Sequence, residues 1–248
     1  VVDDSIEEKP YTDENELISW HWDSSKEKAI KGINYITVMY YAEEIKLPVT
    51  YELVEKTETY IDSKTGKTRR RSSVSKNTRM RRMLLVCVYN KIKFKYVLAD
   101  AWYGSAENMK FIKVELEKEF VFAVKSNRKV ALKEEEKDRG QYIGINKLEM
   151  LEGVPRKVWL EEIDFPVLLV KEEFKNEDGS RGERYLVTSN LELSFDQITT
   201  LYKKRWSVEV YHKSLKQNAG LEKSPTRTVT TQRNHFFASL CAYKIGRA

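Results

Sequence analysis

Cysteine and histidine are scarce in this chain of 248 residues, and long apolar runs are missing. The two cysteines, Cys87 and Cys241, lack CxxC spacing, which argues against a structural zinc site and favours a reducing compartment. Three histidines are too few for a histidine-rich metal site. No run approaches the roughly 18 to 20 apolar residues of a membrane span. The sequence therefore predicts a cytoplasmic protein with no membrane partner, in which carboxylates hold any metal.

Acidic residues are missing from one long segment, residues 63–99. This segment holds twelve lysines and arginines and no aspartate or glutamate, in a chain of net charge +6. A solvated surface normally mixes both signs, so the segment predicts a surface for the phosphate backbone of a nucleic acid. The alternative is a flexible basic loop without a partner. The candidate DNA contacts are Arg69, Arg70, Arg71, Arg79 and Arg82.

Two strands are expected to present acids where they end. The opening residues VVDDS read as the end of a buried strand that delivers Asp3 and Asp4, and we expect further chain upstream of Val1. The run KYVLAD predicts a strand that ends in Asp100, followed by a helix over 106–118 and a strand over 119–126. This order is a βαβ unit with parallel strands. The alternative role for Asp100 is to cap the following turn.

The rest of the chain contains one more hairpin, a basic helix and a β-rich segment. Residues 33–42 and 47–56 predict a hairpin, 62–73 a basic loop, and 74–92 a helix. Residues 127–193 predict a β-rich insertion, with strands within 158–174 and 183–191. Trp159 lies in this insertion, where an exposed indole could stack on an unpaired DNA base. Packing of Trp159 in the core is the alternative.

The stretch Tyr202 to Lys216 predicts one helix with a polar strip. At about 100° per residue, a strip roughly 60° wide holds four side chains. They are Tyr202, Arg205, Glu209 and Lys216. An apolar stripe beside them would pack on a sheet and place the strip at the rim of a core. The alternative is a solvated amphipathic helix with ordinary charge pairs.

Three acids from these elements, Asp4, Asp100 and Glu209, are expected to meet at one edge of a mixed sheet. Carboxylates that lie close together repel one another unless cations neutralise them. Hard divalent cations accept oxygen ligands and leave positions for phosphate oxygens and water. The predicted cofactor is therefore Mg²⁺ or Mn²⁺, with two ions acting in an in-line displacement at phosphorus.

The chain resembles bacterial insertion-sequence transposases of the DDE type. It carries Tyr-x2-Arg-x3-Glu-x6-Lys, the signature of the insertion-sequence-four family, and DDSIEEKPY and YVLADAWYGSAENMKFI resemble the regions of the family's first two acids. Ser5 stands where threonine is more usual. The resemblance implies a metal-binding catalytic triad of Asp4, Asp100 and Glu209. It also implies that Tyr202, Arg205 and Lys216 contact DNA near the cleaved end.

The same resemblance implies an α/β fold with an RNase H-like mixed sheet, flanked by helices and interrupted by a β-rich insertion before the last catalytic helix. The expected domains are 1–126 and 194–248 for the catalytic core, and 127–193 for the insertion. The implied activity is cut-and-paste DNA transposition in the bacterial cytoplasm, at the nucleoid. The implied partners are double-stranded transposon ends and target DNA, held by a homodimer. The alternatives are a DNA-binding protein derived from a transposase, with its chemistry lost, and another RNase H-like nuclease.

Overall fold

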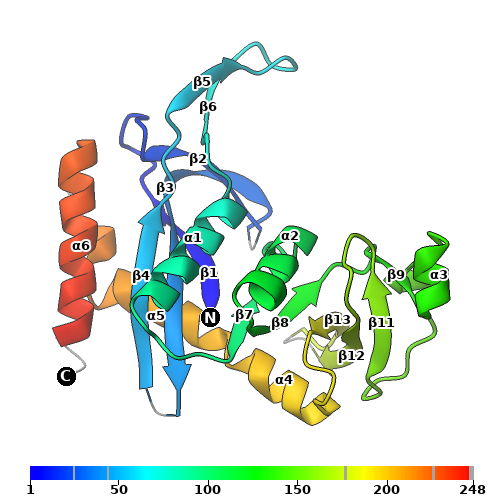
Figure 1. Ribbon diagram of the computed structural model, residues 1–248. Coiled ribbons are helices and arrows are strands. Elements are labelled where there is room, and N and C mark those ends of the chain that lie inside the picture. Colours follow the sequence, from blue (N-terminus) through cyan, green and yellow to red (C-terminus); the bar gives the residue numbers. More distant parts are fainter. Residues whose placement is uncertain (25, 44, 176–177, 225–226, 246–248) are drawn as a thin grey trace. The chain divides into compact units, whose positions relative to one another are not determined.

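The computed structural model describes residues 1–24, 26–43, 45–175, 178–224 and 227–245 (Figure 1). They divide into two compact units. The first unit comprises Val1–Val2 and Ile92–Arg205, and the second comprises Asp3–Lys91 and Trp206–Ala248. Each unit combines strands with helices, so the predicted mixed α/β class is confirmed. The RNase H-like comparison and the predicted domain limits stay predictions.

The first unit is built on a mixed sheet of seven strands in the order β10-β9-β11-β12-β13-β8-β7. Strands β7 and β8 are parallel, and the other neighbouring pairs are antiparallel. The strands are β7 (Tyr96–Ala99), β8 (Glu119–Val124), β9 (Lys129–Ala131), β10 (Ile143–Gly144), β11 (Arg156–Leu160), β12 (Val167–Lys175) and β13 (Arg181–Thr188). The helical elements are α2 (Ala106–Lys110), η1 (Phe111–Glu115), α3 (Glu134–Asp138), η2 (Ile145–Lys147) and α4 (Phe195–Lys203).

The predicted βαβ unit is confirmed by β7, α2 with η1, and β8. The hydroxyl of Ser105 caps α2 by accepting the backbone N–H of Asn108. The helix then continues as a π-helical turn, η1, which ends at Glu115 shortly before β8 begins at Glu119. Gly104 stands in the turn before α2, where a Cβ atom would lie 2.9 Å from the carbonyl oxygen of Ala123 in β8. The absence of a side chain at Gly104 therefore lets this turn approach the sheet.

The β-rich segment is hydrogen-bonded into this same sheet. Strand β13 pairs with β12 on one side and with β8 on the other. The strands expected within 158–174 and 183–191 correspond to the end of β11, to β12 and to β13. Residues 176–177 of the expected hairpin turn lie outside the described residues. The segment thus extends the sheet that begins with β7 and β8.

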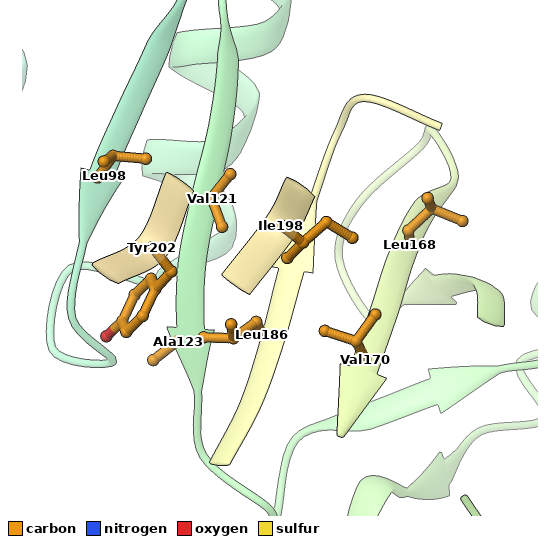
Figure 2. Packing of buried hydrophobic residues seen from close by; sticks show 8 residues of the cluster. All are labelled: Leu98, Val121, Ala123, Leu168, Val170, Leu186, Ile198 and Tyr202. Atoms are coloured by element: carbon orange, nitrogen blue, oxygen red, sulfur yellow. The ribbon is translucent and has the colours of Figure 1, made fainter. Parts of the chain in front are cut away.

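Helix α4 packs on one face of this sheet. Figure 2 shows Ile198 and Tyr202 of α4 among side chains from β7, β8, β12 and β13. The residues of this buried cluster are Leu98, Val121, Ala123, Leu168, Val170, Leu186, Ile198 and Tyr202. Ser194 begins α4 with a capping box, in which its hydroxyl accepts the N–H of Gln197 and the Gln197 side chain accepts the N–H of Ser194. Local capping and burial of its apolar side both favour this helix.

The second unit has a four-stranded sheet in which β3 pairs with β1, β2 and β4. The predicted hairpin over 33–42 and 47–56 is confirmed by β3 and β4, whereas β2 was not predicted. Its strands are β1 (Val2–Glu8), β2 (Ile18–Asp23), β3 (Lys28–Ala42), β4 (Ile45–Leu53), β5 (Glu58–Ile61) and β6 (Thr68–Arg71). Its helical elements are α1 (Lys76–Tyr89), α5 (Trp206–Gln217), η3 (Leu221–Lys223) and α6 (Val229–Ile245).

Helices of the second unit cover both faces of β3 and β4. Phe236 of α6 packs against Tyr35 and Tyr51, with ring centroids 4.7 and 5.0 Å apart. Arg79 of α1 contacts Glu52, the neighbour of Tyr51 on the opposite face of β4. The predicted helix over 74–92 is confirmed by α1. No helix within the described ranges is long and apolar enough to cross a membrane.

Two local predictions were wrong. The strand β1 does not end at its acids, because Asp3 and Asp4 are its second and third residues and it continues to Glu8. Hydrogen bonding to β3 continues past the acids, because the N–H of Lys9 donates to the carbonyl oxygen of Lys31 at 2.9 Å. The basic stretch over 62–73 is also more ordered than a loop. Arg69, Arg70 and Arg71 lie on β6, which pairs with β5 in a separate two-stranded sheet.

Candidate functional site

The sequence predicted that the polar strip lies on one helix, but the structure divides it between α4 and α5. The backbone N–H groups of Lys204 and Arg205 donate to the carbonyl oxygens of Leu201 and Tyr202, three residues earlier. This tightening ends α4, and α5 begins at Trp206. The break coincides with the limit between the two units. Helix α4 buries Tyr202 in the first unit, and α5 buries its own apolar side in the second. Packing in two different cores therefore favours a break over one continuous helix.

Tyr202 is buried against the sheet between two guanidinium groups. The Cζ atom of Arg184, on β13, lies 4.7 Å from the centre of its ring, and that of Arg205 lies 5.7 Å away. Both distances suit cation–π contacts. Burial raises the pKa of the Tyr202 hydroxyl, while Arg205 and Arg184 act to lower it and Asp100 acts to raise it. The phenol is therefore neutral, and it lies within electrostatic reach of Asp100.

Arg184 is itself fixed by a buried acid. Its Nη2 atom donates to Oε2 of Glu172 at 2.7 Å, and its Nε atom donates to the same oxygen at 3.3 Å. The two residues face each other across β12 and β13. Glu172 is 8% exposed, so its charge needs this partner. This pair could not be recognised from the sequence, because Glu172 lies in a charged part of β12 and its partner depends on the strand register.

Asp100 directly follows β7 and is half-buried. Its Oδ1 atom accepts the backbone N–H of Trp102 at 3.0 Å. This contact is the turn cap considered from the sequence. Asp100 therefore caps this turn, and its role in chemistry stays a prediction.

Asp4 receives two donors within the second unit. Nζ of Lys76, the first residue of α1, donates to its Oδ2 at 2.6 Å. Nδ2 of Asn34 donates to the same oxygen at 2.7 Å. The neighbouring Asp3 turns its carboxylate to the backbone, where Oδ1 accepts the N–H of Asp4. Asp4 is thus the acid that side chains of other elements converge on, a pattern that the sequence did not indicate for Asn34 or Lys76.

Two buried histidines lie within electrostatic reach of Asp4. His212 of α5 shares a hydrogen bond of 3.3 Å between its Nε2 atom and the hydroxyl of Thr37, and its ring meets Tyr35 edge-on. Burial lowers the pKa of His212 to about 3, with Lys216 also lowering it and Asp4 opposing. Burial likewise lowers the pKa of His21, on β2, to about 3. Both imidazoles are therefore neutral near pH 7.

Glu209 and Lys216 share α5 and are both half-buried. Seven residues apart, they lie on one side of the helix. Nζ of Lys216 donates to the carbonyl oxygen of Ile6 at 2.7 Å. This bond ties α5 to β1, the strand that carries Asp4. Lys216 thus has a structural contact that the strip interpretation did not include.

The basic residues expected to contact DNA differ in their surroundings. Arg79 is 8% exposed and contacts Glu52 and the hydroxyl of Ser72, so its surroundings do not favour the predicted DNA contact. Acids that precede the basic segment neutralise two others. Arg69 pairs with Asp62 at 3.0 Å and Arg71 pairs with Glu58 at 2.8 Å. Arg82 is exposed on α1, and Arg70 is half-buried on β6.

Trp159 is not the exposed aromatic that base stacking would need. Its side chain lies on β11 and is 7% exposed. It pairs with Ala131 of β9, and Nζ of Lys157 lies 5.1 Å from the ring centre. The alternative of core packing therefore holds for Trp159.

The three acids are divided between the units, with Asp100 in the first and Asp4 and Glu209 in the second. Within the described part of the chain, no group of three or more His, Cys, Asp or Glu residues is placed to hold a metal ion. The chemistry of the donors nevertheless fits a hard cation. All three are half-buried carboxylates, and the Asn34 amide oxygen beside Asp4 is buried without a hydrogen-bond partner among the described residues.

A comparison with protein families identifies a match for more than half of the chain. None of the curated proteins compared with the chain matches it. Residues 61–245 match the family model described as Transposase DDE domain. The matched range is more than half of the chain and includes Asp100 and Glu209, whereas Asp4 precedes it. The chain therefore belongs to the Transposase DDE domain family.

Proposed function

We propose that this protein cleaves DNA strands and transfers the cut ends in a metal-dependent reaction, as a cut-and-paste transposase of an insertion sequence. The observation that carries the proposal is the family match over 61–245, in which Asp100 stands directly after a parallel strand. In open α/β sheets this position commonly carries functional side chains. The signature residues Tyr202, Arg205, Glu209 and Lys216 support the insertion-sequence-four branch.

The proposed triad is Asp4, Asp100 and Glu209, on an RNase H-like core. Their oxygens would hold Mg²⁺ or Mn²⁺, and we propose two ions. When bound, these ions activate an attacking oxygen and stabilise the leaving oxygen at phosphorus. The chain's own residues orient these acids. Lys76 and Asn34 fix the Asp4 carboxylate, and the turn at Trp102 fixes Asp100. The insertion at 127–193 and the predicted domain limits belong to the same proposal.

The DNA partner is proposed to be double-stranded, comprising transposon ends and target, with a homodimer on paired ends. Arg205 would grip a phosphate near the cleaved bond, and Tyr202 would hold the Arg205 guanidinium against its ring. Lys216 would contribute positive charge beside Glu209 while its bond to Ile6 holds α5 in place. A fixed cation positions the phosphorus for in-line attack.

The direct test is magnesium-dependent nicking of supercoiled plasmid together with joining of a labelled linear duplex to a second DNA. Glu209→Gln, Asp100→Asn and Asp4→Asn each keep the size of the side chain and remove its charge. Each is expected to lower nicking by at least about 100-fold, because loss of a metal ligand removes transition-state stabilisation. Duplex affinity in the absence of divalent metal should stay within about twofold.

Two controls accompany this test. Glu192→Gln removes an exposed carboxylate outside the triad and should nick at the wild-type rate. Asp3→Asn should be milder than Asp4→Asn, because Asp3 serves the backbone. Normal nicking by Glu209→Gln would disprove the triad. A wild-type chain that nicks but never joins ends would be a plain nuclease, and one that only binds DNA would have lost its chemistry.

A further inference from the structure

The β5–β6 hairpin forms a sheet of its own within the second unit. Seven of its eight strand residues are exposed, and Arg70 is half-buried. Ile61 is 73% exposed and Tyr60 is 39% exposed. An isolated two-stranded ribbon buries little apolar surface and is marginal in water. Its fold must therefore come from local contacts, and its exposed side chains are available to a partner.

The turn of the hairpin is specified by its residues. Oδ1 of Asp62 accepts the backbone N–H groups of Lys64 and Thr65 at 3.0 and 2.9 Å. Gly66 takes a φ of +67°, which a residue without Cβ adopts most readily. Its N–H donates to the carbonyl oxygen of Asp62 at 2.8 Å and closes the turn. The ribbon is therefore an ordered arm, built by an Asp and a Gly in the right places.

The two faces of the ribbon differ in charge. Side chains alternate along a strand, and the register pairs Tyr60 with Arg69 and Glu58 with Arg71. On that face Arg71 is neutralised by Glu58, and Arg69 by Asp62. We call it the paired face. The other face carries no acid and consists of Thr59, Ile61, Thr68 and Arg70. We call it the open face.

Arg70 is the distinctive residue of the open face. Within the described residues its side chain makes no ion pair or hydrogen bond, in contrast to Arg69 and Arg71. Two further cations, Lys64 and Lys67, are exposed in the turn. On the paired face the attraction of a phosphate to the arginines is offset by repulsion from the carboxylates. On the open face and at the turn that repulsion is missing.

We infer that the β5–β6 hairpin is a DNA-binding arm that lays its open face on duplex DNA. A two-stranded ribbon fits a DNA groove, and an arginine next to an exposed aliphatic side chain suits a phosphate beside apolar sugar or base edges. Arg70 and the turn lysines contact phosphates, and Ile61 contacts the groove. The inference rests on the proposed function for the identity of the partner and extends it to residues outside the triad.

The test measures binding of a fluorescein-labelled 30-base-pair duplex to the full chain without divalent metal, across salt concentrations. Arg70→Gln is expected to reduce the slope of log affinity against log salt by about 0.9, the value for one phosphate contact. Ile61→Thr should lower affinity without changing that slope. The matched control is Glu58→Gln with Arg71→Gln, which removes a neutral pair from the paired face, keeps the net charge and should leave the slope unchanged.

The outcomes separate the arm from the chemistry. If Asp100→Asn abolishes nicking but still shows the Arg70-dependent slope, both proposals gain support. If wild-type nicks plasmid and Arg70→Gln binds with unchanged slope and affinity, the arm is disproved and the transposase proposal stands. Conversely, Arg70-dependent binding by a chain that never nicks supports the arm and contradicts the catalytic proposal. If Arg70→Gln leaves binding intact but dissociates a dimer in light scattering, the arm pairs with a second copy and the inference is overturned.

Discussion

Helices α4 and α5 come from one continuous amphipathic stretch, yet their buried polar groups are stabilised in opposite ways. On α4 the buried Tyr202 lies between two cations, and one of them, Arg184, is paired with the buried acid Glu172. On α5 the buried polar group is His212, which is neutral and shares a hydrogen bond with Thr37. The comparison teaches that one sequence pattern can support a charged network in one core and a neutral one in another.

The cause lies in what each helix meets. The strands under α4 present Glu172 and Arg184 directly opposite each other, so a counter-charge is available. The strand under α5 presents Thr37 and the ring of Tyr35, which offer a hydroxyl and an apolar edge. A charged imidazole there would lack a partner, and the low pKa of His212 is the result. Three measurements test this difference between the two helices.

The largest effect is expected from core truncations that should stay within one unit each. Ile198→Ala on α4 and Leu215→Ala on α5 each remove a fully buried side chain and should lower the free energy of unfolding by about 2–5 kcal/mol. Hydrogen exchange should accelerate in β8, β12 and β13 for Ile198→Ala and in the second unit for Leu215→Ala. Lys213→Ala, on the exposed side of α5, is the control. Equal acceleration in both units for either truncation would contradict separate cores.

An intermediate effect is expected from acid. Below about pH 6.5 an unfolded histidine takes up a proton, whereas His212 and His21 stay neutral in the folded chain down to about pH 3. The stability that these groups contribute is therefore complete above pH 6.5 and declines as the pH falls. Between pH 6.5 and pH 5, each of the two histidines should lower the free energy of unfolding by about 2 kcal/mol. Denaturant unfolding at both values measures it, and His212→Gln should remove about half of the combined pH dependence.

The smallest effect is expected at the cation stack of α4. Arg184→Met leaves Glu172 without its partner and should destabilise the first unit by about 2 kcal/mol, less than a fully buried pair because the Arg184 side chain is 31% exposed. Combining Arg184→Met with Glu172→Gln should recover part of the lost stability. The single variant Arg184→Lys should not reproduce the contact with the Tyr202 ring. Thermal melting compares these variants with Arg181→Met, an exposed arginine on the same strand. Similar losses for both arginines would show that the stack contributes nothing specific.

The sequence predicted those parts of the fold that local pattern determines. Strand β7 and its Asp100, the parallel β8, the β3–β4 hairpin and α1 follow from apolar runs and turn residues. The predicted helix over 202–216 failed because its periodicity continues across the break. Only tertiary packing on two different sheets divides it.

The site was predicted less completely. The candidate acids could be named from the sequence, but the residues that hold them could not, since Lys76 and Asn34 reach Asp4 from 72 and 30 positions away. Likewise, Arg79 and Trp159 looked available in sequence and are buried, because burial depends on the strand register and on helix packing. The charge pattern was also misleading for Arg69 and Arg71, because acids outside the basic segment neutralise both of them.

The division of the chain between the units has a consequence for its synthesis. Residues 92–205 of the first unit are contiguous, whereas the second unit needs Asp3–Lys91 and then Trp206 onward. On a ribosome adding about 5–20 residues per second, β1 to β4, which end at Leu53, wait on the order of 8–30 s for α5 to begin at Trp206, and longer for α6. During that interval Tyr35 and its neighbours lack the rings of His212 and Phe236 that cover them. The sheet of β1 to β4 is thus translated before the sheet of the first unit and completed after it. We expect nascent chains halted before residue 206 to engage chaperones through this uncovered face.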